Sequence, residues 1–161
     1  MDSARIAIQI DIGFGDAVTP AAVEMRYPTL LNDIPAPLLR VYPRETVFAE
    51  KLEAIVKLGM INSRMKDYFD LLTLVNEDAM DAVQLAKAID ATFARRETPL
   101  PASLPIGLSI GFSNDNSKQV QWRAFLRKNK LEAPMLQEVV TVLADFARIA
   151  FEGAMKNRAG E

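Results

Sequence analysis

The spacing of apolar residues changes once along this chain, and that change limits the folds it can adopt. Between Arg5 and Phe14, apolar residues occupy every second position: Ile6, Ile8, Ile10, Ile12 and Phe14. A period of two places these side chains on one face of a strand and the residues between them on the other. The segment therefore predicts a strand with one face on the core.

A second, shorter strand is predicted further along the chain. The stretch 15–37 has prolines at scattered positions and no regular period, so it is predicted to be irregular. By contrast, 38–41 is short, apolar and bounded by prolines. That pattern predicts a strand lying against the first.

Beyond Pro43 the apolar period becomes helical. Apolar residues recur with helical spacing from Phe48 to Val56, on a segment that Pro43 can begin and Gly59 can end. The same period predicts four further helices, at about 62–75, 81–95, 117–130 and 134–156. The connector 96–117 is rich in proline, serine and glycine but carries large apolar residues, so it is expected to pack over the core.

These elements predict an α+β fold that is mostly helical, with two strands followed by five helices. Half of the 161 residues are hydrophobic, enough to close one core, so a single domain 1–161 is expected. Its parts are a strand region at 1–42, a first helical region at 43–95, the connector at 96–117 and the C-terminal helices at 118–157. Two strands leave an edge and a face uncovered, so we expect a homo-oligomer or a complex.

The composition excludes several kinds of site. The chain has no cysteine and no histidine, which rules out disulfides, thiol nucleophiles, imidazole bases and the common zinc sites. A metal would have to sit on carboxylates, which favours Mg²⁺, Mn²⁺ or Ca²⁺. The net charge of −2 gives no global attraction for nucleic acid. No leader or membrane span is recognisable in the sequence, so a cytoplasmic protein without membrane contact is expected.

Lys51 stands among apolar neighbours on its predicted helix. The residues three and four positions away are Val47, Phe48, Ala54 and Ile55. The ammonium group of Lys51 either reaches along the core edge to water or points at an anion such as phosphate, and we favour the phosphate. Lys57 offers a contrast, because Glu53 lies four residues before it. An exposed ion pair between the two would fully explain a lysine at this position.

Asp67 and Asp70 lie three residues apart on one face of the second predicted helix, where their charges repel. One interpretation is a salt-bridge ladder that joins Arg64 to Asp67 and Lys66 to Asp70. The other is that one of these aspartates orders Lys51 or a metal-bound substrate. The spacing favours neither.

Four cations give the 117–130 segment a basic side: Arg123, Arg127, Lys128 and Lys130. Trp122 and Phe125 lie among them, and aromatic residues interleaved with cations are typical of single-stranded nucleic acid binding. The interpretation we favour is that the aromatic residues form a buried stripe and that the cations are simply solvated.

Three motifs follow one another along the chain. They read Ile-Asp-Ile-Gly-Phe-Gly-Asp at 10–16, Ala-Glu-Lys-Leu at 49–52 and Lys-Asp-Tyr-Phe-Asp-Leu at 66–71. In order and spacing they resemble the later motifs of the AbiEii/AbiGii toxin-like nucleotidyltransferases. The segment from Leu104 to Leu126 is similar to the family's C-terminal region, so the resemblance covers nearly the whole chain.

The resemblance implies a remnant of a polymerase-β-like nucleotidyltransferase sheet backed by helices. It implies Mg²⁺-dependent transfer of a nucleotide from an NTP to an acceptor such as tRNA, by a toxin that acts beside a cognate antitoxin. It also implies roles for single residues: Asp11 would hold metal, and Lys51, Asp67 and Asp70 would act in catalysis. Lys51 and Arg64 would contact the nucleotide.

The family's opening motifs are missing from the sequence as given. Its Gly-Ser motif and Asp-x-Asp pair would precede Asp11, where only ten residues stand. Because two-metal phosphoryl chemistry needs those carboxylates, the chain alone is expected to be incomplete or inactive, and to need an upstream half-protein. The alternative is a non-catalytic nucleotide-binding or protein-interaction remnant of the same fold.

Overall fold

A computed structural model describes residues 15, 17–77 and 80–160 of the chain. In these residues two antiparallel strands precede six α-helices, which confirms the mostly helical α+β fold. The strands are β1, Val23–Arg26, and β2, Leu38–Val41. The strand predicted at 5–14, with Asp11, lies outside the described residues.

The strand β2 has the predicted bounds, but its partner was not predicted. It pairs antiparallel with β1, with Val23 opposite Val41 and Met25 opposite Leu39. The interpretation of 15–37 as irregular was therefore wrong for 23–26. Val23, Met25 and Tyr27 do alternate with Glu24 and Arg26, but this period of two covers only five residues and was outweighed by the scattered prolines of the segment.

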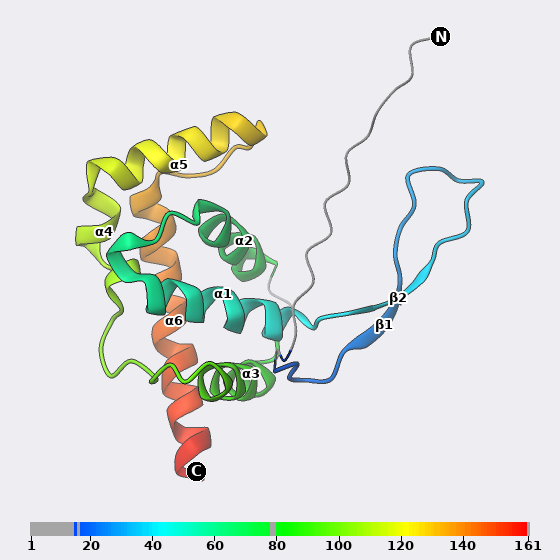
Figure 1. Ribbon diagram of the computed structural model, residues 1–161, viewed down its shortest axis with the longest axis horizontal. Coiled ribbons are helices and arrows are strands. Elements are labelled where there is room, and N and C mark those ends of the chain that lie inside the picture. The colour runs from blue at the N-terminus through cyan, green and yellow to red at the C-terminus, as the bar shows by residue number, and fades with distance from the viewer. Residues whose placement is uncertain (1–14, 16, 78–79, 161) are drawn as a thin grey trace.

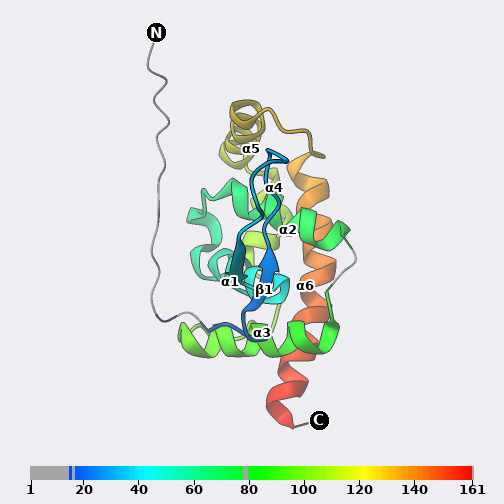
Figure 2. The same ribbon diagram turned by 90° about the vertical axis from the view of Figure 1, so that its right-hand side faces the viewer.

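Residues 23–41 form a hairpin that projects from the helices (Figure 1) and points toward the viewer in the turned view (Figure 2). None of these residues is buried. Its exposed large apolar side chains are Val23, Met25, Tyr27, Leu30, Leu31, Ile34, Leu38 and Leu39. The chain before the hairpin is attached at Thr46, whose hydroxyl donates to Thr19 O at 2.8 Å and accepts from Thr19 N at 3.1 Å.

The first two helices follow the predicted pattern closely. Helix α1 is Arg44–Leu58 and α2 is Met65–Asn76, joined by a short 3₁₀ turn, Gly59–Ile61. Gly59 ends α1 with a φ of 50°, a conformation that glycine adopts without strain. Before α2, the side chain of Asn62 accepts a hydrogen bond from Arg64 N at 2.8 Å.

The remaining helices include one that was not predicted. Helix α3 is Ala82–Arg95, α5 is Asn116–Asn129 and α6 is Leu136–Ala159, all near their predicted bounds. The connector contains a 3₁₀ turn, Ile106–Leu108, and the short helix α4, Ile110–Asn114. The connector does pack on the core through Leu108 and Phe112, but Leu104, Ile106 and Ile110 remain exposed.

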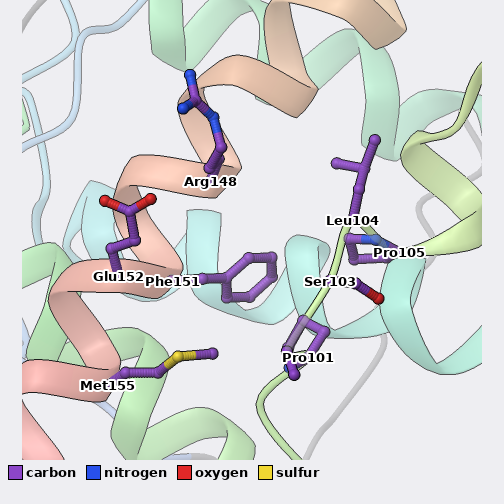
Figure 3. A pocket seen from close by; sticks show the side chains of 9 residues that line it. Pro101, Ser103, Leu104, Pro105, Arg148, Phe151, Glu152 and Met155 are labelled. Atoms are coloured by element: carbon purple, nitrogen blue, oxygen red, sulfur yellow. The ribbon is translucent and has the colours of Figure 1, made fainter.

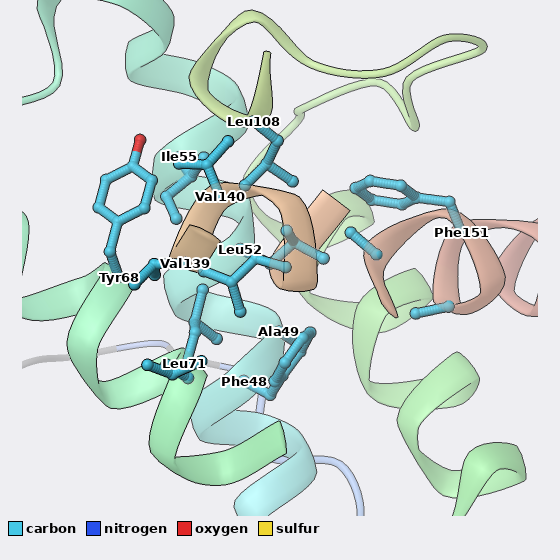
Figure 4. Close-up of a cluster of buried hydrophobic side chains, with 14 of the residues drawn as sticks. Phe48, Ala49, Leu52, Ile55, Tyr68, Leu71, Leu108, Val139, Val140 and Phe151 are labelled. Atoms are coloured by element: carbon cyan, nitrogen blue, oxygen red, sulfur yellow. The ribbon is translucent and has the colours of Figure 1, made fainter. Parts of the chain in front are cut away.

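The core forms where α6 crosses the first three helices. Helix α6 contacts α2, α3 and α4, while α1 contacts α2 and α3. Figure 4 shows the cluster, with Phe48, Leu52, Ile55, Tyr68, Leu71, Val139, Val140 and Phe151 among its members. Tyr68 donates its hydroxyl to Gly107 O at 2.9 Å, which ties the connector to α2. A Cβ at Gly107 would stand 2.9 Å from Ile55 O, so only glycine fits there.

Glu53 is a buried charge that the sequence interpretation misplaced. Its side chain is 1% exposed and accepts hydrogen bonds from Arg96 Nη1 at 2.9 Å and Thr98 Oγ1 at 2.5 Å. The predicted exposed pair with Lys57 is therefore wrong. The i, i+4 spacing allowed that pair, but α3 ends beside α1 and supplies Arg96 as the nearer partner. The network joins α1 to the chain that follows α3.

Candidate functional site

Lys51 reaches from α1 to two carboxylates on α2. Its Nζ lies 2.9 Å from Asp67 Oδ1 and 2.7 Å from Asp70 Oδ2. The side chain of Lys51 is only 18% exposed, and that of Asp67 is 3% exposed. The helical spacing of Asp67 and Asp70 puts both on the face of α2 that meets α1, so three residues from two motifs converge.

The salt-bridge ladder along α2 and the contacts of the aspartates to Lys51 occur at the same time. Arg64 Nε lies 2.8 Å from Asp67 Oδ2, a charge contact without hydrogen-bond geometry, and Lys66 Nζ lies 2.5 Å from Asp70 Oδ2. The salt-bridge ladder along α2 is therefore present. Both aspartates also order Lys51, so the residues form one connected cluster, here called the Lys51 cluster: Lys51, Arg64, Lys66, Asp67 and Asp70.

The charges of the Lys51 cluster suit an anion better than a metal. Three cations surround two carboxylates, which leaves one net positive charge. A divalent cation needs oxygen ligands that are free to bind it, and both carboxylates are already held by ammonium or guanidinium groups. Within the described ranges no group of three or more acidic residues could hold a metal ion. Asp11, the predicted metal ligand, lies outside those ranges.

The ionisation of the Lys51 cluster follows from its contacts. Burial lowers the pKa of Lys51, but the carboxylates of Asp70 and Asp67 outweigh this and hold that pKa above its usual value. Burial likewise raises the pKa of Asp70, while Lys51 and Lys66 outweigh it and bring the pKa below its usual value. Lys51 and Asp70 are therefore both charged near neutral pH.

A groove of about 450 Å³ runs beside the Lys51 cluster, between the start of α2 and α5. It is lined by Ser63, Arg64, Met65, Lys66, Asp67, Gln121, Ala124 and Phe125. Arg64, Lys66 and Asp67 belong to both the groove and the cluster. A ligand in this groove would therefore meet the positive side of the cluster directly.

Lys118 is a buried cation that sequence interpretation missed. Its Nζ donates to Asn62 O at 2.9 Å and lies 5.4 Å from the centre of the Phe112 ring. Asn62 in turn binds Arg64 N, so Lys118 fixes the chain from which Arg64 projects. The available signal was the position of Lys118 four residues before Trp122, on the buried side of the same helix.

Of the two aromatic residues of α5, Trp122 is buried, as the favoured interpretation predicted, and Phe125 is half-buried. Trp122 is buried and donates Nε1–H to Pro134 O at 3.0 Å. Phe125 packs on Phe69 with ring centres 6.0 Å apart. Trp122 is therefore withdrawn from any ligand, whereas Phe125 still contributes to the lining of the groove.

A second pocket lies between the connector and α6, and Figure 3 shows it from close by. Its volume is about 260 Å³, and Leu104, Phe151 and Met155 make it largely apolar. Arg148 and Glu152 are the charged residues in its lining. None of the predicted site residues contributes to it, so it adds nothing to the Lys51 cluster.

One comparison with known proteins relates the whole arrangement to a family. The family model described as "Nucleotidyl transferase AbiEii toxin, Type IV TA system" matches residues 1–153. Neither a curated protein nor a solved structure matches the chain. The matched residues include α1, α2 and α5, and therefore the Lys51 cluster and its groove.

Proposed function

Because the chain belongs to the AbiEii nucleotidyl transferase toxin family, we propose that it moves a nucleotide from an NTP to a hydroxyl of an RNA acceptor such as tRNA. Family membership carries the coarser statement, that of a nucleotidyltransferase-like toxin of a type IV toxin–antitoxin system. The observation that supports the finer statement is the positive Lys51 cluster beside an open groove. A cognate antitoxin and the cytoplasm, where NTPs and tRNA occur, complete the proposal.

Four of the five residues of the Lys51 cluster have a proposed part in this reaction. The acceptor oxygen attacks the α-phosphorus of the NTP, the bond to the bridging oxygen of the β-phosphate breaks, and pyrophosphate leaves while the hydroxyl proton passes to solvent. Lys51 and Arg64 contact the phosphates and stabilise the charge that develops on them. Asp67 and Asp70 are positioning residues, because they hold Lys51 in place.

Mg²⁺ remains part of the proposal, although the carboxylates of the Lys51 cluster do not fit it. The ion would neutralise phosphate charge. We assign its binding to carboxylates other than Asp67 and Asp70, with Asp11 as the candidate. We expect the 161-residue chain by itself to transfer little nucleotide and to bind NTP·Mg²⁺ weakly, because these residues make only part of a site.

The test compares Lys51 with Lys57, two lysines on one helix in different surroundings. Transfer of α-labelled NTP to RNA would be measured for the chain, or for a longer product that contains it. Lys51→Ala should lower the rate about 10²-fold or more, the usual effect of removing one group that stabilises transition-state charge. Lys57→Ala should leave it unchanged, because the Lys57 side chain is exposed and forms no ion pair within the described ranges.

A second pair of measurements separates chemistry from folding. Lys51→Arg keeps the charge and should restore part of the rate, while thermal unfolding reports whether each variant is folded. Equal rates in the Lys51→Ala and Lys57→Ala variants would show that the cluster only joins α1 to α2. The proposed phosphate role would then be wrong.

Binding without transfer is the second candidate function. The observation that favours it is that both carboxylates of the Lys51 cluster are already neutralised by cations. Calorimetry with NTP and Mg²⁺ on the chain, run beside the transfer assay, distinguishes the two. Micromolar binding with no transfer in any form of the protein would favour the non-catalytic alternative.

The exposed hairpin supports a partner for this chain. Among the residues that the structure describes, each of its two strands has an open edge and eight large apolar side chains are exposed, a pattern typical of association surfaces. We propose a second copy of the chain or an upstream half-protein as the partner. No helix in the described residues is both long and apolar enough to cross a membrane.

A further inference from the structure

Helix α5 carries a row of cations that the Lys51 cluster does not use. Arg123, Arg127 and Lys130 follow one another at spacings of four and three residues, which puts them on one side of the helix. Lys128 lies beside this row. All four side chains are exposed, and the sequence from 116 to 130 contains no acidic residue. We call these four residues the α5 basic row.

The α5 basic row is unusual because its charges are not balanced nearby. The chain as a whole carries a net charge of −2, and other cations such as Arg44, Arg96 and Arg158 are paired with carboxylates. Within the described ranges, none of the four residues of the row lies in an ion pair. Their combined field is therefore available to a partner with several negative charges.

The groove connects the α5 basic row to the Lys51 cluster. Gln121 and Ala124 line the groove from α5, and Lys128 follows them on the same side of the helix, seven residues after Gln121. The opposite wall carries Arg64, Lys66 and Asp67. The cations that line the groove itself are Arg64 and Lys66, and Arg127 and Lys128 lie three and four residues after Ala124, next to it on α5.

We propose that the α5 basic row binds the phosphodiester backbone of the RNA acceptor, whose end enters the groove beside Arg64 and Lys66. This inference rests on the proposed function for the identity of the acceptor. Because Trp122 is buried and Phe125 is half-buried against Phe69, the main contact of the row is to phosphates and not to stacked bases. Binding is therefore weakly dependent on sequence and strongly dependent on salt.

The test uses a double charge reversal and a matched control. Arg123→Glu with Arg127→Glu alters the row, while Lys57→Glu with Lys87→Glu alters two exposed lysines on α1 and α3 and changes the net charge by the same amount. Fluorescence anisotropy would follow a labelled single-stranded RNA at several salt concentrations, without NTP. Neither pair belongs to the Lys51 cluster, so the phosphate site itself is untouched.

The expected result is a loss of affinity of tenfold or more for the row variant and of threefold or less for the control. The salt dependence of the row variant should also weaken, by about 0.7 in the logarithmic slope for each phosphate of a single strand that the variant no longer neutralises. Equal losses in both variants would show only a general field and would overturn the proposal. So would competition by a poly-glutamate peptide at the same charge concentration as RNA, which indicates an acidic protein partner.

One further variant separates this inference from the proposed function. Lys51→Ala should bind the labelled RNA as tightly as the unmodified chain, because Lys51 is not in the row. If transfer is absent in every form while RNA binding through the row persists, the proposed function fails and the binding surface stands. If transfer occurs and the row variant has an unchanged KM for RNA, the binding surface is wrong and the transferase stands.

Discussion

The helical body, residues 44–159, and the hairpin, residues 23–41, use the same apolar residue types in opposite ways. In the body, Leu52 and Leu71 are each 1% exposed, whereas Leu30 in the hairpin is fully exposed. A helix pairs its own backbone groups and needs only a neighbour for its apolar stripe. The hairpin has open edges and no layer above or below it, so its apolar residues have nothing in the described structure to cover them.

The helical body thus buries its apolar residues against its own helices, whereas the apolar residues of the hairpin need a partner to cover them. The body contains the core, the Lys51 cluster and the α5 basic row. The hairpin contributes none of these and is attached next to its base, through Thr19 and Thr46. Substitutions in the two regions should therefore have very different consequences for folding.

The largest expected effect is that of removing an aromatic ring from the body. Phe93 is fully buried and meets the Phe151 ring edge-on with centres 5.8 Å apart. Phe93→Ala should lower the free energy of unfolding by about 3–5 kcal/mol, whereas Tyr27→Ala in the hairpin should change it by less than about 0.5 kcal/mol. Urea denaturation measures both. A similar cost for Tyr27→Ala would mean that the hairpin is packed in solution.

The next effect concerns a buried carboxylate and an exposed one. Glu53→Ala removes the carboxylate that binds Thr98 and Arg96 and leaves the Thr98 hydroxyl with only a long hydrogen bond to Arg96 O at 3.4 Å, which should cost about 1–3 kcal/mol of unfolding free energy. Glu24→Ala in the hairpin is the control and should be within about 0.5 kcal/mol of the unmodified chain. If the two variants melt alike, the Glu53 network does not stabilise the body.

A smaller effect is expected from the pH dependence of the Lys51 cluster. Because the pKa of Asp70 is lowered in the folded state, its contribution to stability is present above its unfolded pKa and is lost as the pH falls below about 4. The pKa of Lys51 is raised, so its contribution is present below about pH 10 and is lost as the pH rises further.

Asp70→Asn removes the carboxylate that loses its charge in acid. Its melting temperature should therefore fall less between about pH 6 and pH 3 than that of the unmodified chain. Asp33→Asn, in the exposed hairpin loop, serves as the control and should leave the acid dependence unchanged. Parallel curves for the unmodified chain and the Asp70 variant would show that the Lys51 cluster does not stabilise the fold.

The smallest effect on unfolding is expected within the hairpin itself. Leu31→Ser with Leu39→Ser should alter the free energy of unfolding by less than about 0.5 kcal/mol per site, because both side chains are exposed. The same variant should reduce self-association in sedimentation velocity, since apolar side chains in water favour association. A clean monomer for the unmodified chain at high concentration would contradict the proposed homo-oligomer.

Local pattern was sufficient for much of the fold. The periods of apolar residues predicted α1, α2, α3, α5 and α6 close to their observed bounds, because a helix of three turns or more repeats its stripe several times. Shorter elements carry a weaker signal: β1 and α4 have four and five residues and were missed, whereas β2 was predicted from its apolar residues between two prolines. The predicted metal ligand Asp11 and the strand around it lie outside the described residues.

What the sequence determined about the site was the unusual setting of Lys51 and the shared face of Asp67 and Asp70, since both follow from helical spacing alone. Only the tertiary structure decided that these residues meet, because ion pairs between α1 and α2 depend on how two helices pack, which no spacing within one helix specifies. The same reason explains Glu53 and Lys118. Glu53 had a plausible solvated partner on its own helix, while Lys118 lies on the buried side of its helix, and the partners of both come from distant segments: Arg96 and Thr98 for Glu53, and the backbone of Asn62 for Lys118.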